Sequence, residues 1–219
     1  MKQICLASLA VAAMLAAGCS KHETTPKNEA AGTSGRNESV SRGDRDFVQE
    51  VSSLNAAEID LSRLALERGS SPDVKKFAQM AVDDHTAAGD KLSGVAVQNS
   101  IDAPATIDDS HRSRHDTLAG KQGADFDRGY IDAMIDDHQK LVDKLESRID
   151  RDTLSKYQST AADKVTDKKP EVEVKAQTVL PEKSDDPVTQ RINAWAADTY
   201  PAAYAHLQAA KDLKKRATE

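Results

Sequence analysis

The sequence predicts an all-α protein whose folded part is an antiparallel four-helix bundle. In four separate segments, apolar residues recur at alternating steps of three and four, which is the spacing of one face of an amphipathic helix. Only 4% of the 219 residues are aromatic, and no segment shows the convincing alternation that is typical of strands. Four helices with a total of about 135 residues can bury an adequate single core.

The N-terminus indicates secretion and lipidation. Residues 1–18 have the pattern of a bacterial signal peptide, with Lys2 ahead of an apolar run that is too short for a transmembrane helix. The letters LAAGC, which end at Cys19, resemble a lipobox, where a diacylglyceryl group is attached to the cysteine and the chain is cut before it. We therefore expect a lipoprotein that contacts the membrane through the lipid on Cys19. Ser20 favours the outer membrane, with the chain facing the periplasm. The alternative is a plain signal peptide with a soluble product.

Cysteine content and charge exclude several classes of protein. Cys5 lies in the signal peptide and Cys19 would carry the lipid, so the folded part has no disulfide, thiolate metal site or cysteine nucleophile. The formal net charge is −6 at pH 7. A mildly acidic chain without a basic patch is a poor nucleic-acid binder, so we expect no nucleic-acid partner.

The first two helices follow a tether and are separated by a short turn. Residues 19–43 contain almost no large apolar residue and predict a flexible tether. The folded domain is expected over residues 44–214. Its first helix should end at Gly69, and the second should begin at Pro72 with Ser71 as the N-cap.

The second half of the domain contains two further long helices. After a loop, residues 109–120 predict a short helix, and an apolar stripe over residues 130–149 predicts the third long helix. The segment 150–185 is charged and contains prolines, and we interpret it as an insertion that is partly helical at its start and otherwise mobile. Asp186 is expected to cap the last helix, with Pro187 in its first turn.

Each of the four apolar stripes contains one ionisable residue that does not suit a hydrocarbon core. These residues are Glu58, His85, His138 and His206. A buried polar group without a partner costs about 2–7 kcal/mol, so four such groups, one on each helix, are expected to meet and satisfy one another. Three imidazoles and a carboxylate could hold one divalent transition metal ion, and these ligands do not choose among Zn²⁺, Cu²⁺, Fe²⁺, Ni²⁺ and Mn²⁺. The alternative is a buried Glu–His hydrogen-bond network without metal.

The heights of these residues along their helices agree in part. In an up-down-up-down bundle, Glu58, His85 and His138 fall near one level at about 1.5 Å per residue. His206 lies deeper in its helix and would be about 9 Å out of line if the helix ends were flush. A fourth helix that starts earlier than its neighbours would restore the register.

The segments AVDDHTAAGDKL and MIDDHQKLVDKL carry the same pattern. Residues 77–92 match residues 130–145 with a shift of 53. A duplication of two helical hairpins would place His85 and His138 at equivalent points across the bundle axis. The alternative is that two helices meet the same packing demand.

Aspartates and two further histidines lie near these motifs. Asp84 and Asp137 precede the repeated histidines, and adjacent helix positions point about 100° apart, so these aspartates cannot share the centre with them. Each could hold a ring N–H of a histidine on a neighbouring helix, which is the usual support of a metal-bound histidine, or lie in solvent. His111 and His115 share one face of a polar segment, where we expect a solvated surface rather than a second metal site.

Three blocks of the chain resemble the bacterial domain-of-unknown-function family 4142, over about residues 44–149 and 186–213. The blocks begin FVQEVSSLNAAEID, FDRGYIDAMIDDH and YPAAYAHLQAAKDL. The family pattern maps onto Asn55, Glu58, Asp84, His85, Phe126, Asp127, Tyr130, His138, Pro201 and His206. This resemblance implies a secreted envelope protein with a ferritin-like bundle, and the insertion at residues 150–185 is a departure from the pattern.

The ferritin-like superfamily includes di-iron proteins, whose sites use Glu-x-x-His on two helices. In this chain, Val82 and Ile135 stand three residues before His85 and His138. Neither side chain can bind a metal, so di-iron chemistry is not expected.

The leading hypothesis is a periplasm-facing lipoprotein whose bundle binds, buffers or senses a divalent transition metal through the Glu/His cluster. The alternative is a structural or envelope-stress interaction protein with a metal-free buried network, whose protein partners the sequence does not identify. An enzyme is the last of the three hypotheses, because the chain has no nucleophile–base motif, glycine-rich phosphate loop or nucleotide fingerprint.

Overall fold

The structure, a computed structural model, describes residues 40–164 and 179–217. The helices in these residues are α1 (Arg42–Arg68), α2 (Pro72–Gln98), α3 (Asp109–Ala119), α4 (Gly123–Glu146), α5 (Arg151–Lys164) and α6 (Pro187–Arg216). Apart from an isolated β-bridge between Ile149 and Pro181, the regular structure of the described part is helical, which confirms the predicted all-α class. The predicted signal peptide, Cys19 and the tether up to residue 39 lie outside the described residues.

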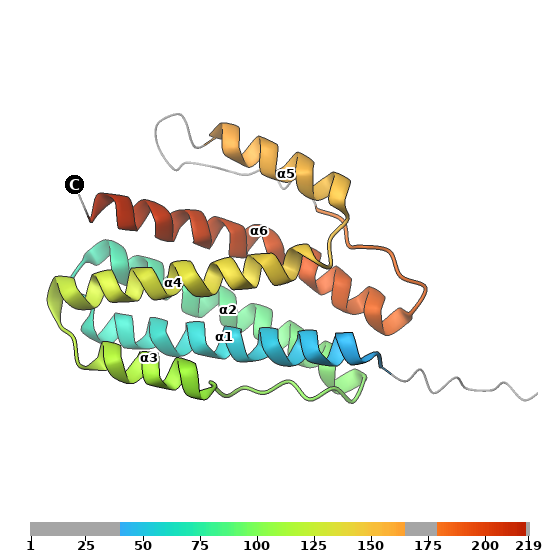
Figure 1. The fold of residues 1–219 in the computed structure, drawn as a ribbon, viewed down its shortest axis with the longest axis horizontal. Helices are drawn as coiled ribbons and strands as arrows, with labels where there is room; N and C mark the ends of the chain where they lie inside the picture. Colours follow the sequence, from blue (N-terminus) through green and yellow to red (C-terminus); the bar gives the residue numbers. More distant parts are fainter. Residues whose placement is uncertain (1–39, 165–178, 218–219) are drawn as a thin grey trace, which may run out of the picture. The chain divides into compact units, whose positions relative to one another are not determined.

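Helices α1, α2, α4 and α6 form the bundle. Helix α1 packs against α2 and α4, and α6 packs against the same two helices from the other side. Figure 1 shows α1 and α6 running in one direction and α2 and α4 in the other, so each of these packed pairs is antiparallel. Within the described ranges, no helix is both long enough and apolar enough to cross a membrane.

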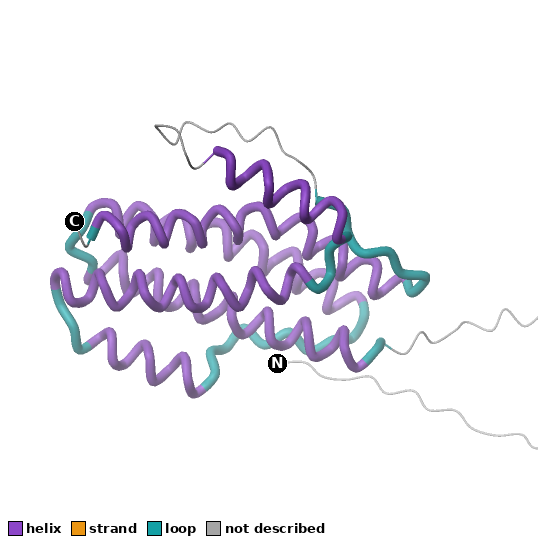
Figure 2. Tube along the Cα trace, turned by 45° about the horizontal axis from the view of Figure 1, so that its top comes forward, coloured by secondary structure: helices purple, strands orange, loops and turns teal. Residues whose placement is uncertain are grey.

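The up-down-up-down order assumed for the bundle is wrong. The connection between α2 and α4, which contains α3, runs back along the bundle, so α4 starts at the same end as α2 (Figure 1, Figure 2). The 11 residues of α3 span about 16 Å, and the ten-residue loop before it can reach about 33 Å. Together they cover the length of α2, about 40 Å. On this path α3 packs against α1 and α4.

The repeated motif lies on α2 and α4, which are parallel and lie diagonally across the bundle. His85 and His138 are therefore on opposite helices of the bundle, as a duplication would place them. Two helices that meet the same packing demand would agree with this arrangement as well.

The helix ends lie where the local chemistry places them. Helix α1 begins earlier than expected, with Ser41 as its N-cap, and is followed by Gly69. Ser71 precedes α2 as predicted, but its side chain makes no capping bond. The carboxylate of Asp127 on α4 instead accepts the backbone N–H of Ser71 at 2.9 Å and fixes the turn between α1 and α2. Asp186 caps α6 as predicted, since one oxygen accepts the N–H groups of the two residues after Pro187, both at 2.8 Å.

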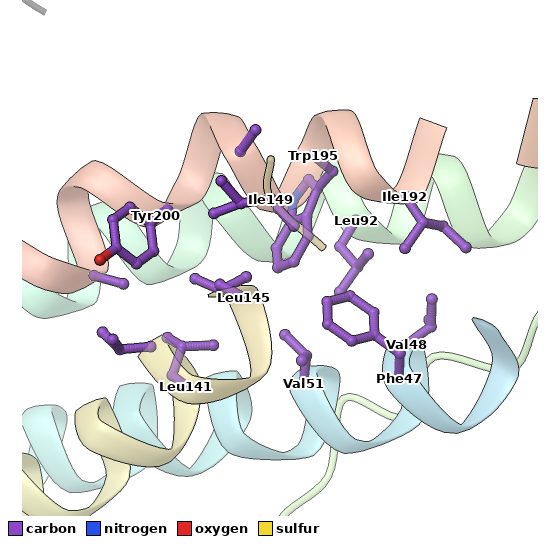
Figure 3. Close-up of a cluster of buried hydrophobic side chains, with 14 of the residues drawn as sticks. Phe47, Val48, Val51, Leu92, Leu141, Leu145, Ile149, Ile192, Trp195 and Tyr200 are labelled. Carbon is purple, nitrogen blue, oxygen red and sulfur yellow. The ribbon is translucent and has the colours of Figure 1, made fainter. Parts of the chain in front are cut away.

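The core consists of two apolar clusters on either side of a polar layer. Figure 3 shows the first cluster, in which all four bundle helices meet. Its labelled members are Phe47, Val48, Val51, Leu92, Leu141, Leu145, Ile149, Ile192, Trp195 and Tyr200. The second cluster includes Leu61, Leu64, Val74, Phe77, Phe126, Tyr130, Met134 and Leu213. On α1, α2 and α4, the ionisable residue singled out in the sequence lies between members of the two clusters, and on α6 His206 lies next to Leu207, the last member of the first cluster.

The described parts of the insertion pack on the bundle. Its start forms α5, as predicted, and Tyr157 on this helix lies 5.6 Å from Tyr200 and 5.8 Å from Tyr204, measured between ring centres. The segment that returns to α6 is held by the bridge between Ile149 and Pro181. The predicted mobility of residues 165–178 falls outside the described residues.

A buried charge network joins three helices at the end of the bundle where α1 begins. Asp44 is 1% exposed. Its carboxylate accepts hydrogen bonds from Arg148 Nη1 at 2.6 Å, Thr189 Oγ1 at 2.7 Å and Ser41 Oγ at 2.8 Å. The Arg148 guanidinium also lies 4.5 Å from the centre of the Phe47 ring. The network ties α1 to the segment after α4 and to the first turn of α6.

We predict that Asp44→Ala lowers the free energy of unfolding by about 3 kcal/mol, because it leaves the largely buried Arg148 without its anion. The control is Asp46→Ala, which removes an exposed partner of Arg42 at 3.5 Å and should cost less than about 0.5 kcal/mol. Urea unfolding of both variants measures the difference. Equal losses would contradict a structural role for the network.

Candidate metal centre

The structure brings together the ionisable residues of the four apolar stripes. The ring centres of the three histidines are 5.1 Å (His85–His138), 5.6 Å (His85–His206) and 5.4 Å (His138–His206) apart. Their exposed fractions are between 0% and 4%, and Glu58 is fully buried. His206 does not show the offset of about 9 Å that flush helix ends would give. The ends are not flush, because α6 has 30 residues and α4 has 24.

Each histidine engages one ring nitrogen outside the cluster. The partners are Asn55 Oδ1 for His85 Nδ1 (3.0 Å), the Met134 carbonyl oxygen for His138 Nδ1 (2.9 Å) and Asp84 Oδ2 for His206 Nε2 (2.9 Å). All three partner atoms are oxygens that can only accept, so each of these nitrogens carries the proton. In the neutral rings, the lone pairs are therefore on the nitrogens that face the centre.

The nitrogens that face the centre are His85 Nε2, His138 Nε2 and His206 Nδ1. The first two are 3.2 Å apart, and His206 Nδ1 is buried without a hydrogen-bond partner among the described residues. One potential ligand atom from each of the three histidines lies within 4.8 Å of those of the other two. Two lone pairs at 3.2 Å repel each other unless a proton or a metal ion lies between them.

Glu58 lies behind two of the histidines rather than among the inward nitrogens. Its Oε2 is 2.9 Å from His85 Nδ1, and its Oε1 is 3.3 Å from His138 Nδ1. Neither contact has the direction of a hydrogen bond, so both oxygens are buried without one. The contacts are therefore electrostatic. Sequence reasoning placed Glu58 among the ligands, and the structure places its carboxylate beside the Nδ1 atoms of His85 and His138.

The pKa values of the cluster are shifted in opposite directions. Burial opposes the ionisation of Glu58, but the charges of His138 and His85 outweigh it and lower its pKa to about 2. Burial also acts against the charged form of His85, but Glu58 outweighs it and raises the pKa of His85. Burial lowers the pKa of His138 and, with the charges of His85 and His138, lowers that of His206 to about 4. Near pH 6.5 and without metal, these shifts favour a Glu58 anion beside a charged His85, with the other two rings neutral.

The two repeated aspartates have different roles. Asp84 accepts the ring N–H of His206 on the neighbouring α6. This is the first of the two roles that the sequence suggested for the aspartates. Asp137 does not contact the cluster histidines in this way. It is fully buried and accepts a hydrogen bond from Arg114 Nη1 at 2.8 Å, with His111 Nε2 at 3.6 Å.

The expectation that His111 is solvated is wrong. It is 6% exposed, and its Nδ1 lies 2.8 Å from Asp108 Oδ2. Its segment forms a helix that packs against α1 and α4, so a polar stretch of sequence is covered on one side. His115, one turn further on, keeps 31% of its side chain exposed.

Sequence reasoning missed the role of Asn55 and its dependence on Gly89. Besides contacting His85 Nδ1, the Asn55 amide donates a hydrogen bond to the His85 carbonyl oxygen at 2.9 Å. A Cβ atom on Gly89 would lie 2.7 Å from Asn55 Nδ2. The available signals were the place of Asn55 in the family pattern and a glycine inside a helix, four residues after His85.

We predict that Gly89→Ala destabilises the protein although alanine is the better helix former. Replacing a helix-interior glycine with alanine normally adds about 1 kcal/mol, but here the methyl group displaces Asn55 and breaks hydrogen bonds worth about 1–3 kcal/mol. Gly94→Ala is the matched control on the same helix, because its Cβ would meet nothing within 4 Å. Urea unfolding should show a gain for Gly94→Ala and a loss for Gly89→Ala. A gain in both would contradict the packing of Asn55 described here.

We predict that the metal-free protein is most stable near pH 6.5, the ordinary pKa of histidine. Below this pH, the unfolded chain binds protons on all three cluster histidines, whereas the folded cluster carries a charge on His85 alone, so stability falls as pH falls. Above it, the unfolded chain releases these protons while folded His85 retains one, so stability falls as pH rises. The limiting slope is about 1.4 kcal/mol per pH unit for each proton.

Urea unfolding in the presence of a chelator, from about pH 4.5 to about pH 8, measures this profile. The His206→Asn variant separates the contribution of the cluster from that of carboxylates elsewhere in the chain. It lacks one histidine that binds a proton in the unfolded chain but not in the folded cluster, so its stability should fall less below the maximum. Identical profiles for the two proteins would contradict the assigned protonation states.

Comparisons with known proteins identify a family and one solved structure with a similar fold. A family model described as Domain of unknown function (DUF4142) matches residues 29–167, which include Glu58, His85 and His138 but not α6. The crystal structure of a DUF305 fragment from Deinococcus radiodurans is similar with a TM-score of 0.51 and 16% identity, over 80% of this chain and 97% of that chain. At this identity the similarity shows the fold alone. No curated protein matches the chain. Because the family model covers more than half of the sequence, the chain belongs to the DUF4142 family.

Proposed function

We propose that this protein binds one divalent transition metal ion inside its bundle, with His85 Nε2, His138 Nε2 and His206 Nδ1 as ligands. The observation that carries the proposal is the convergence of three buried imidazoles whose other nitrogens are held by oxygen acceptors. Metal-bound histidines typically have this support.

The spacing of the nitrogens suits a metal. Two ligands of a tetrahedral zinc site, each about 2.0–2.1 Å from the ion, are about 3.3 Å from each other. His85 Nε2 and His138 Nε2 are 3.2 Å apart. An ion bound to both would also satisfy His206 Nδ1, which otherwise remains buried without a partner at a cost of about 1–3 kcal/mol.

The charges also suit a cation. Glu58 is an anion behind His85 and His138, and Asp84 supports His206. With a bound cation, His85 can be neutral while Glu58 still balances part of the charge. The ligands are almost fully buried, which leaves little access for a substrate. We therefore propose binding, buffering or sensing of the metal rather than catalysis.

The sequence supports a location for this activity. A lipid on Cys19 would anchor the chain to the outer membrane, and a coil of the length of the tether spans about 25–30 Å. The bundle would then bind metal in the periplasm, close to the membrane.

A structural or envelope-stress role is the second candidate. A protonated His85 can donate Nε2–H to His138 Nε2 at 3.2 Å, which completes a Glu–His network without metal. In this case the cluster would only fix the packing of the bundle.

Elemental mass spectrometry distinguishes the two functions. We predict about one metal ion per chain in protein purified without chelating resin, and none in the His85→Ala/His138→Ala/His206→Ala variant. His115→Ala is the control, because it removes a partly exposed histidine outside the cluster. Metal should raise the melting temperature of the wild type by mass action and leave the triple variant unchanged.

The affinity should fall between about pH 7.5 and about pH 5, because the ligands must lose protons to bind. A metal-free wild type that is not stabilised by added divalent ions would favour the structural role. An affinity that is unchanged over this pH range would count against histidine ligands.

A further inference from the structure

We propose that Asp84 is the entry point of the metal ion, at which an exposed carboxylate captures the cation and passes it to the centre beside His206. This inference rests on the proposed metal binding. It addresses a problem that the geometry raises, because the inward nitrogens belong to residues that are 0–4% exposed. A cation must therefore cross a wall of the bundle to reach them.

Between α2 and α6, an exposed carboxylate directly contacts a histidine of the cluster. The Asp84 side chain is 52% exposed, whereas that of His206 is 4% exposed, and the two are joined by the 2.9 Å contact between Oδ2 and Nε2. The opposite nitrogen of the same imidazole, Nδ1, faces the centre without a hydrogen-bond partner. One ring therefore separates a carboxylate in solvent from the cluster.

The neighbours of His206 on its own helix are small, while Phe77 on α2 packs against the ring at 6.1 Å between ring centres. The residues three and four positions from His206 on α6 are all alanines: Ala202, Ala203, Ala209 and Ala210. Pro201, one turn earlier, lies inside α6 and has no N–H for the helix ladder. Small side chains and a missing backbone bond reduce the resistance to a movement of the His206 ring.

A rival route is less suitable for a cation. A cleft of about 520 Å³ lies between α1, α2 and the loop 103–107, and Asn55 separates it from His85. The lining of this cleft contains two positive residues, Arg63 and Arg112, and two negative residues, Asp60 and Asp90. Their charges cancel, so the cleft has no net attraction for a cation. Both polar atoms of the Asn55 amide are already bonded to His85, on the side of Nδ1 rather than of the inward Nε2.

The neighbouring aspartate provides a matched control. Asp83 is also exposed and also on α2, but it points about 100° away from Asp84 and accepts a hydrogen bond from Gln79 at 2.8 Å. Asp83→Asn and Asp84→Asn change the net charge equally. The amide oxygen of an asparagine at position 84 can still accept the N–H of His206, which preserves the orientation of the ring.

The experiment is stopped-flow absorbance of Co²⁺ binding to the purified protein at low and high ionic strength. We expect Asp84→Asn to lower the association rate constant by about fivefold at low ionic strength, because one attracting charge is lost at the point of entry. Asp83→Asn should change it by less than about twofold, and salt should reduce the difference between the variants. Asp84→Glu, which keeps the charge, should restore most of the rate.

Equal association rates in the two asparagine variants would overturn the entry route. Weaker binding that results only from a larger dissociation rate constant would also overturn it, because Asp84 would then only orient His206. If the wild type binds no Co²⁺, the metal site itself fails. The experiment thus separates a failure of the proposed function from a failure of the route.

Discussion

The structure depends on the close contact of four ionisable side chains in the middle of an apolar core. Glu58 and the three histidines lie where two hydrophobic clusters meet, and a single unpartnered polar group there would cost about 2–7 kcal/mol. Each residue therefore constrains the rotation and the height of its helix. Ring nitrogens 3.2 Å apart leave little tolerance for a one-residue shift of about 1.5 Å. Apolar side chains alone would specify the register less strictly, so we attribute the alignment of the helices to this layer.

The helix ends could be predicted because their causes are local. Gly69, Pro72 and the Asp186–Pro187 pair act on the backbone over one turn, and the observed ends follow them. The direction of α4 could not be predicted in the same way. It depends on the path of the connection that contains α3, and tertiary contacts with α1 and α4 determine this path.

The candidate site was predictable to the extent that its residues break the hydrophobic pattern. An ionisable residue on an apolar stripe is visible in the sequence, and so is an aspartate turned about 100° from it. The side of the ring on which Glu58 lies depends on rotamers, which periodicity does not describe. His111 was misjudged because a polar segment gives no sign of the surface that covers it. Gly89 was missed because a glycine inside a helix has several explanations, and only the position of Asn55 distinguishes them.

The charge network around Asp44 would have a mechanical consequence if a lipid on Cys19 held the chain at its N-terminus. A pull on the residues before α1 reaches the first turn of this helix, where Asp44 is bonded to Arg148 and Thr189. The load is then shared between α1, the end of α4 and the start of α6. A helix end held only by its own backbone bonds would unravel turn by turn, whereas this end is also bonded to Arg148 after α4 and to Thr189 on α6. The bundle is thus reinforced at the point where an anchored chain would transmit force.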